Sequence, residues 1–315
     1  MDAVKGQGEV TLKQDDVFDL SIPGKKEDYV GKGKAISVYS DPTFSPQNVS
    51  RTEILDFGNE GFLLNNLLTR DECVHIIQEG EKIGFEPIEN GRLDYRSSER
   101  ILLRCPELSE LLYKRTEPFL GQVTIDGEPT DYHVQGVKAA LQGTWTPIGL
   151  NEIWRLCRYY PEGHFAPHFD GHFVRNQRER SLKTFMVYLN ADFTGGTTNF
   201  VQEGQQLYKD DTGKFCAEEK KILCRLQPLE GQAIVFNHHR LHEGGRLKSG
   251  VKYILRTDLM YRRCDDGRTS PREERAILLL QDAERCEENG ESTRAAELYR
   301  QAFKLSPSIA EQFRS

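Results

Sequence analysis

The chain has 315 residues, with 42 Lys and Arg against 49 Asp and Glu, so its formal net charge is −7. This mild acidity argues against a protein whose main partner is nucleic acid or an anionic membrane, and no apolar run approaches the roughly 20 residues that a membrane span needs. Its 37% hydrophobic and 10% aromatic residues are enough for a folded chain with a hydrophobic core.

The seven cysteines are scattered along the chain and include no C-x2-C pair. This pattern is typical of reduced thiols and argues against a disulfide framework or a cysteine-ligated zinc site. The first 16 residues lack the apolar stretch of a secretory signal. We therefore expect a cytoplasmic protein.

Residues 1–55 are rich in Gly, Lys, Asp, Ser and Pro and show no sustained periodicity, which predicts an irregular N-terminal arm. Residues 56–150 are predicted to form a helix-rich support for the segment that follows. A first helix is expected after Thr69, because Glu72 three residues later completes a capping box. A second helix is expected from Pro106, since proline is favoured in the first helical turn.

Residues 151–262 differ from the preceding part of the chain. Short β-branched and aromatic runs are bounded there by Gly, Pro and Asn, with too few helical stretches between them for a βαβ sheet. An antiparallel barrel or jelly roll is the better architecture. The predicted fold class is therefore mainly β with flanking helices.

Helical periodicity returns in residues 263–315. The positions from Leu279 to Pro307 resemble one tetratricopeptide repeat, a helix-turn-helix unit of about 34 residues. Because one copy cannot bury its own face, we expect it to pack on the barrel, on another chain or on a peptide. The alternative is an amphipathic helical hairpin that caps the domain.

A candidate metal site follows from three residues in the β-rich segment. His168 and Asp170 are two residues apart, so they face the same side of an extended strand. His242 follows another apolar run and can reach them from a neighbouring antiparallel strand. Two imidazoles and one carboxylate form the facial triad of non-haem Fe(II) oxygenases. His238 and His239 are rival third ligands.

Three protein ligands leave coordination positions for a chelating α-keto acid and for O2. The distal carboxylate of such an acid needs a cation in the barrel. Lys252, ten residues after His242, is the first candidate. Arg256, four residues further on the same strand face, is the alternative; its planar fork suits a carboxylate, but it could instead pair with Asp258 or a neighbouring strand.

Residues 56–262 resemble the prolyl 4-hydroxylase-like branch of the 2-oxoglutarate- and Fe(II)-dependent dioxygenases. The resemblance rests on four motifs in order: FLLNNLLTRDEC with YRSSER, RYYPEGHFAPHFDG, SLKTFMVYLNADFTGGTTNF, and HEGGRLKSGVKYILR. It implies a double-stranded β-helix core packed against N-terminal helices. It also implies Fe(II) as cofactor, 2-oxoglutarate and O2 as cosubstrates, and ascorbate as a further candidate.

The resemblance implies roles for individual residues. His168, Asp170 and His242 match the iron ligands, and Lys252 matches the residue that holds the 2-oxoglutarate C5 carboxylate. Further candidates for the cosubstrate pocket match an aromatic or hydroxyl residue of the family, namely Tyr188, Thr198 and Tyr159, with Tyr160 as an alternative to the last. Ordinary packing inside the barrel is the competing interpretation for each.

The expected reaction is hydroxylation of a C–H bond in a protein, a peptide or an amino-acid-like substrate, with release of succinate and CO2. The alternatives are the same chemistry on a free small metabolite, with desaturation or ring formation, and a non-catalytic β-barrel binding module. The chain departs from collagen-modifying members in lacking a secretory signal and paired cysteines. Its insert after Asp170 carries Arg175, a candidate substrate contact, together with Arg178 and Arg180. With Arg155, Arg158 and Lys252 these make the predicted surroundings of the iron basic.

Overall fold

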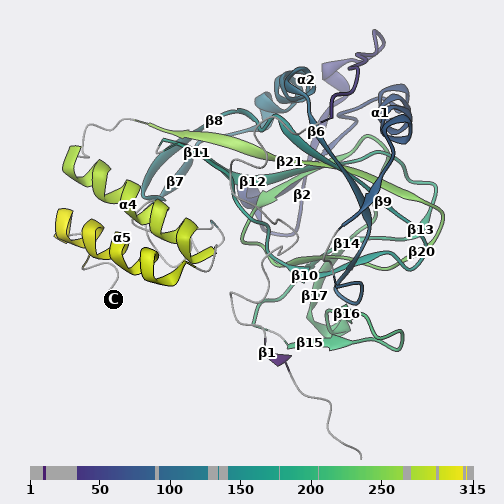
Figure 1. The fold of residues 1–315 in the computed structure, drawn as a ribbon. Helices are drawn as coiled ribbons and strands as arrows, with labels where there is room; N and C mark the ends of the chain where they lie inside the picture. Colours follow the sequence, from purple (N-terminus) through teal and green to yellow (C-terminus); the bar gives the residue numbers. More distant parts are fainter. Residues whose placement is uncertain are drawn as a thin grey trace, which may run out of the picture.

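Two antiparallel sheets form the centre of the computed structural model (Figure 1). The larger has the strand order β2-β3-β18-β12-β21-β9-β6-β4, formed by Ser50–Glu53, Gly61–Asn65, Ala233–Asn237, Glu179–Tyr188, Lys252–Arg263, Ile153–Tyr159, Glu99–Arg104 and Glu86–Pro87. The smaller has the order β17-β14-β19-β10-β5, formed by Ile222–Leu226, Thr198–Val201, His242–Gly244, His164–His168 and Arg96–Ser97. The predicted mainly β fold with a jelly-roll core is confirmed.

Shorter elements extend these sheets. The larger sheet gains β11 (Val174–Asn176) beside β12, and β8 (Gly143–Leu150) with β7 (Val123–Ile125) beside β21. Two small sheets are formed by β1 (Val10–Thr11), β15 (Gln206–Lys209) and β16 (Phe215–Cys216), and by β13 (Thr194–Gly195) and β20 (Leu247–Ser249). The 3-10 turns are η3 (Pro46–Asn48), η4 (Gly58–Glu60), η5 (Glu117–Phe119) and η7 (Glu219–Lys221).

The structure describes residues 10–11, 34–88, 92–126, 134, 141–176, 178–204, 206–264, 271–288, 291–307 and 310. Most of the arm predicted for residues 1–55 therefore lies outside the described residues.

Alternation along the strands of the larger sheet separates two environments. On β12, Phe185 and Val187 belong to one apolar cluster, whereas Met186 and Tyr188 belong to a second cluster on the opposite face. This is the period of two that a strand imposes on its side chains. The first face packs against helices, and the second face looks toward the smaller sheet, so one sheet supplies both the core and the wall of the site.

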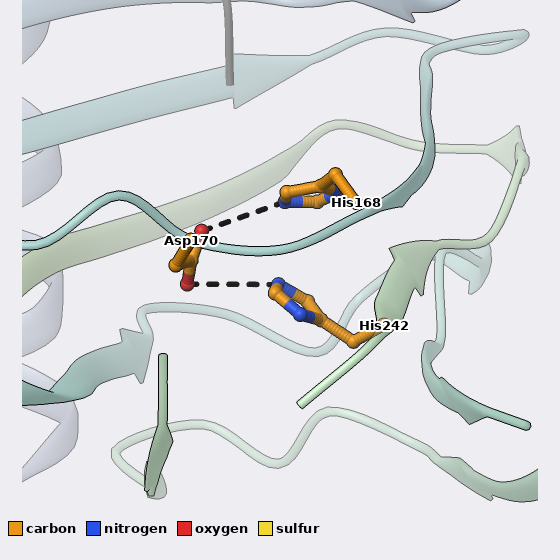
Figure 2. Close-up of side chains that lie close together, drawn as sticks. All are labelled: His168, Asp170 and His242. Atoms are coloured by element: carbon orange, nitrogen blue, oxygen red, sulfur yellow. Dashed lines mark ion pairs between the residues drawn. The ribbon is translucent and has the colours of Figure 1, made fainter. Parts of the chain in front are cut away.

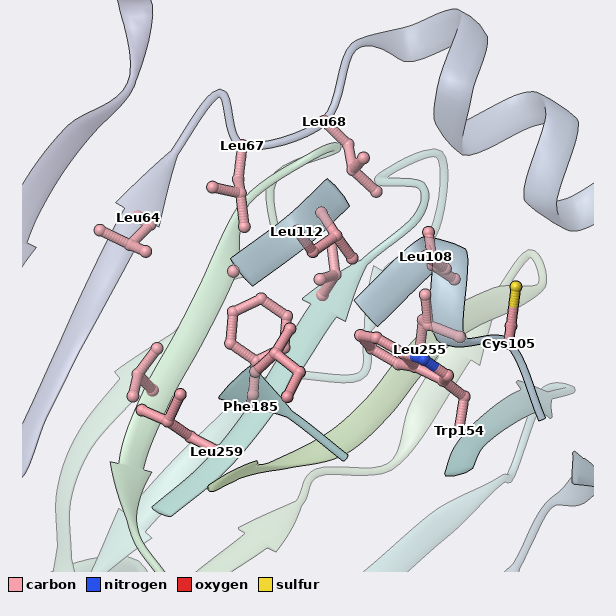
Figure 3. Packing of buried hydrophobic residues seen from close by; sticks show 14 of the residues in the cluster. Leu64, Leu67, Leu68, Cys105, Leu108, Leu112, Trp154, Phe185, Leu255 and Leu259 are labelled. Carbon is pink, nitrogen blue, oxygen red and sulfur yellow. The ribbon is translucent and has the colours of Figure 1, made fainter. Parts of the chain in front are cut away.

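Two helices cover the outer face of the larger sheet. Figure 3 shows Leu108 and Leu112 of α2 (Pro106–Thr116) lying over Phe185, Trp154 and Leu255 of the strands. Helix α2 begins at the proline from which the sequence predicts it. Burial of such large apolar side chains contributes roughly 1.5–3 kcal/mol each, so this layer is a main source of the barrel's stability.

Helix α1 (Arg70–Ile83) begins with the predicted capping box. The backbone N–H of Glu72 donates to Thr69 Oγ1 at 3.3 Å, and the backbone N–H of Thr69 donates to the Glu72 carboxylate at 2.9 Å. The same carboxylate accepts two hydrogen bonds, each of 2.7 Å, from Arg115 of α2. Both side chains are buried, so this ion pair joins the two helices away from water.

The C-terminal residues form a helical hairpin of α4 (Pro271–Glu288) and α5 (Ser292–Leu305), which stands to one side of the barrel in Figure 1. Ala276, Leu280 and Ala302 are buried where the two helices meet. The likeness to a tetratricopeptide repeat stays a prediction. Within the described ranges, no helix has the length and apolar character to cross a membrane.

Replacement of Arg115 by leucine should lower the free energy of unfolding by about 3–5 kcal/mol, because the Glu72 charge would remain buried without its partner. Urea unfolding followed by circular dichroism measures this. Arg104→Leu is the matched control, since its ion pair with Glu152 is solvent-exposed and is expected to contribute less than about 1 kcal/mol. Equal losses in the two variants would contradict the assignment.

Candidate metal centre

The three predicted metal ligands lie together between the two sheets. His168 is the last residue of β10, Asp170 follows two residues later, and His242 is the first residue of β19. Strands β10 and β19 are antiparallel neighbours, and His168 lies opposite His242 in their register. Strand pairing therefore brings together residues that are far apart in the sequence, and Figure 2 shows both imidazoles directed at Asp170.

The donor atoms converge without bonding to one another. His168 Nε2 lies 3.6 Å from Asp170 Oδ1, and His242 Nε2 lies 3.7 Å from Asp170 Oδ2. One donor atom from each of the three residues lies within 4.8 Å of the others, and all three side chains are buried. The separations exceed hydrogen-bond length, so the arrangement leaves room for an ion that all three contact.

Backbone carbonyls determine which ring nitrogens face this space. Nδ1 of His168 lies 2.8 Å from the Ala166 carbonyl oxygen, and Nδ1 of His242 lies 2.9 Å from that of Arg240. A carbonyl oxygen only accepts, so both Nδ1 atoms carry a hydrogen, and in a neutral imidazole the lone pair is then on Nε2, which faces the site. Burial also lowers the pKa of His242 to about 3, which keeps this imidazole neutral.

Asp170 supplies the negative charge. Burial alone would raise the pKa of its carboxyl group, but the charge of Arg256, with Nη2 2.7 Å from Oδ1, is the first of several interactions that hold it well below the usual range. Oδ2 accepts a hydrogen bond of 2.6 Å from Thr184 Oγ1. Oδ1 is the oxygen that the Arg256 guanidinium contacts. Two imidazoles with Nε2 turned to the same space and an ionised carboxylate fit Fe(II).

A directed chain of hydrogen bonds lies behind Asp170. Because the carboxylate only accepts, the Thr184 hydroxyl donates to it and must accept from His238 Nδ1–H at 3.0 Å. His238 Nε2 then accepts from Ser181 Oγ at 2.8 Å, and Ser181 Oγ accepts the backbone N–H of Phe173 at 2.7 Å. Burial lowers the pKa of His238 to about 4, so it is neutral. His238, which the sequence offered as an alternative third metal ligand, instead orients the hydroxyl of Thr184.

The other rival, His239, stacks on the ring of Phe169 with centroids 4.1 Å apart. Its neighbour in sequence, His238, is engaged by the hydroxyls of Thr184 and Ser181. The structure thus brings His242 to the other two ligands and gives His238 and His239 different surroundings.

A cavity that is partly open to solvent extends from the three ligands. Lys252 lies in its wall and donates a hydrogen bond of 2.6 Å to the Gly196 carbonyl, with Nζ 5.8 Å from the ring centre of Tyr159. Thr198 and Tyr159 also line the cavity. The Tyr188 hydroxyl donates to Thr198 Oγ1 at 2.7 Å. Burial lowers the pKa of Lys252 to about 7.

The predicted basic residues separate into two groups. Arg155, Lys252 and Arg256 line the cavity. By contrast, Arg175 pairs with Glu179 at 3.2 Å and its side chain is 41% exposed, outside the cavity wall that the described residues define. Arg158 pairs with both Glu81 and Glu99. Of the basic residues that were predicted to surround the iron, only some therefore face the site.

Thr184 is not among the residues predicted from the sequence, and Arg155 is predicted there only as a nearby cation. A signal for both was available in strand alternation. Thr184 lies four residues before Tyr188 on β12, and Arg155 lies four residues before Tyr159 on β9, so each shares a face with a predicted pocket residue.

Replacing Thr184 by valine should weaken metal binding about 10- to 100-fold, the usual effect of losing a group that orients a ligand. Titration with Fe(II) under argon, or with Co(II), measures the affinity. Thr257→Val is the control, because Thr257 is a buried strand threonine whose hydroxyl bonds the carbonyls of Asn151 and Ile153. An unchanged affinity in Thr184→Val, or an equal loss in both variants, would refute this role.

Comparison with known proteins bears on this site. Residues 154–257 match the family model described as the 2OG-Fe(II) oxygenase superfamily, and this range contains all three ligands and Lys252. Curated proteins gave no match.

Solved structures with a similar fold include three prolyl hydroxylases. A viral collagen prolyl hydroxylase from Paramecium bursaria Chlorella virus-1 is 21% identical, covers 66% of this chain and 99% of its own, and has a TM-score of 0.40. A Pseudomonas putida prolyl-4-hydroxylase is 13% identical, with coverages of 65% and 94% and a TM-score of 0.38. A Trichoplax adhaerens prolyl hydroxylase in complex with a peptide fragment of hypoxia inducible factor is 16% identical, with coverages of 67% and 86% and a TM-score of 0.39. Residues 154–257 therefore match the 2OG-Fe(II) oxygenase superfamily, and the ligand cluster lies within them, which supports an oxygenase that depends on 2-oxoglutarate and Fe(II).

Proposed function

We propose that this oxygenase hydroxylates a C–H bond of a protein, peptide or amino-acid-like substrate, with His168, Asp170 and His242 holding the iron. The observation that carries the proposal is the convergence of two Nε2 lone pairs and one ionised carboxylate in a buried cavity. Carbonyl groups and Thr184 hold these donors in place, so the site is organised to bind one face of a metal ion and leave the other face open.

Lys252 is the proposed partner of the 2-oxoglutarate C5 carboxylate. It is buried in the cavity wall four residues before Arg256 on β21, a span of about 13 Å along a strand. Arg256 lies against Asp170, so Lys252 is the cation at a distance from the ligands, as a chelating diacid requires. Thr198 and Tyr159 would line the same pocket, and the Tyr188 hydroxyl would orient Thr198.

When bound, Fe(II) and 2-oxoglutarate activate O2, so that one oxygen atom enters succinate as CO2 is released and the other enters the substrate. The chain's own residues position these groups and limit the access of water. Phe165 stacks on the His168 ring with centroids 3.5 Å apart, and Phe236 contacts His242 edge-on at 4.7 Å. This apolar cover keeps the ligand rings in place and the cavity partly dry.

A prolyl residue is the substrate that the four sequence motifs favour, and a free small metabolite is the alternative. The seven cysteines all lie in described ranges and are free thiols, which supports the cytoplasmic location that we propose. Ascorbate as a cofactor, Arg175 as a substrate contact, and a partner for the C-terminal hairpin stay predictions from the sequence.

His168→Ala and Asp170→Asn should each abolish the conversion of 2-oxoglutarate to succinate, because each removes one of three metal ligands. Succinate release in the presence of Fe(II) and O2 measures this, including turnover without substrate. His75→Ala is a control at a histidine of α1 that bonds Ser37. Undiminished succinate from either ligand variant would sink the metal assignment.

Binding of 2-oxoglutarate above pH 7 should take up about one proton, because Lys252 has a pKa of about 7 in the free protein and must be charged to pair with a carboxylate. The affinity should therefore fall as the pH rises from 7 to 9. Calorimetry under argon in buffers of different ionisation enthalpy measures the uptake.

Two variants check this role of Lys252. Lys252→Arg should remove the proton uptake, since arginine stays charged. Lys252→Ala should raise the KM for 2-oxoglutarate roughly 10- to 100-fold, as expected for loss of a hydrogen bond to a charged group. An unchanged KM would transfer the role to Arg256.

A further inference from the structure

Arg155 enters the cavity beside the metal ligands. It lies on β9 directly opposite Arg256 of β21, and opposite residues of antiparallel strands have Cβ atoms about 4.5–5.5 Å apart. Both arginines line the cavity. Because Arg256 Nη2 is 2.7 Å from Asp170 Oδ1, the strand register places Arg155 next to the metal centre, at the end of the cavity away from Lys252.

The charge of Arg155 is poorly compensated. Its side chain is 13% exposed, and its ion pair with Asp258 is at 4.0 Å. Among the residues that the structure describes, its buried Nε has no hydrogen-bond partner, and neither does Asp258 Oδ1. Like charges opposite each other in a sheet are unfavourable, so the pairing with Arg256 adds to the cost of this position.

Two other arginines have guanidinium charges that are fully paired with carboxylates. Arg115 places both Nη atoms 2.7 Å from the two oxygens of Glu72. Arg158 bonds the carboxylates of both Glu81 and Glu99. These two arginines are closely paired, whereas the ion pair of Arg155 is longer and its side chain lines the cavity of the metal centre.

The cavity as a whole carries an excess of positive charge. Four cations line it, Arg96, Arg155, Lys252 and Arg256, against the two carboxylates Asp170 and Glu243. The two charges of Fe(II) and those of the 2-oxoglutarate dianion cancel each other, and the buried Asp258 offsets one further positive charge, so an excess of positive charge remains when both are bound. A further anion would be attracted to this space.

We infer that Arg155 binds a carboxylate of the substrate beside the metal. The planar guanidinium matches a carboxylate through two parallel hydrogen bonds, and Arg155 lines the cavity in which the substrate would bind. This inference rests on the proposed function, since it places the anion in a cavity that already holds the iron and 2-oxoglutarate. The carboxylate belongs to a free amino-acid-like substrate or to an acidic side chain of a peptide.

The test uses the full chain loaded with Mn(II) and saturating 2-oxoglutarate under argon, so that no turnover occurs. Proton relaxation by Mn(II) reports any small molecule bound near the metal. One pair of probes is N-acetyl-L-proline and its carboxamide, which differ only in the carboxylate. The other pair is an end-blocked pentapeptide with proline beside either glutamate or glutamine.

In the wild-type protein, Mn(II) should accelerate the proton relaxation of the carboxylate probe in at least one pair. It should leave the matching amide probe unaffected. The pair that responds identifies the source of the carboxylate. Arg155→Leu should raise the apparent Kd of that probe roughly 10- to 100-fold, as for loss of hydrogen bonds to a charged group. Arg155→Lys should retain part of the binding, and Arg104→Leu, which removes an exposed arginine, should retain all of it.

Equal relaxation of carboxylate and amide, no relaxation of any probe, or full binding by Arg155→Leu would overturn the inference. Water proton relaxation separates this outcome from failure of the proposed function. If the protein enhances the water relaxation of Mn(II) above that of free Mn(II) in the wild-type protein and Arg155→Leu but not in His168→Ala, the metal site stands and the carboxylate subsite alone is refuted. If none of the proteins binds Mn(II), the proposed function itself fails.

Discussion

The antiparallel pairing of β10 with β19 is the constraint on which the rest of the site depends. It sets His168 opposite His242, and the two-residue step to Asp170 completes the ligand set on the same side. A slip of one residue would turn one imidazole to the other face of the sheet. Since β19 is also bonded to β14, with Phe200 opposite His242, the position of the distal histidine is held by strands on both sides.

Electrostatics in the cavity follow from burial combined with specific partners. Burial keeps His242 and His238 neutral, while Arg256 keeps Asp170 ionised despite its burial. The same low-dielectric surroundings depress the pKa of Lys252, because no carboxylate is paired with it in the described chain. The charged side chains of the cavity are therefore positioned before any ligand binds, and their partners would be the metal ion and the anions that bind there.

The larger sheet separates structural from functional demands. One face packs against α1 and α2 through large apolar side chains (Figure 3), and there the ion pair of Glu72 with Arg115 is complete. The opposite face carries Thr184, Arg155 and Lys252 into the cavity. Polar groups on that face can remain incompletely hydrogen-bonded because the packing of the opposite face stabilises the fold. Functional sites commonly depart from ideal bonding in this way.

The sequence by itself determined the helix starts after Thr69 and at Pro106, the mainly β core, and the ligand candidates, because capping, alternation and the H-x-D spacing are local properties of the chain. Tertiary structure decided what depends on strand register. It separated His242 from His238, set Arg256 against Asp170, and turned Arg175 outward while Arg155 faces the cavity. The two histidines are close in sequence and the arginines are alike in type. Alternation assigns each of them a strand face, but the pairing of distant strands decides which face meets the metal ligands.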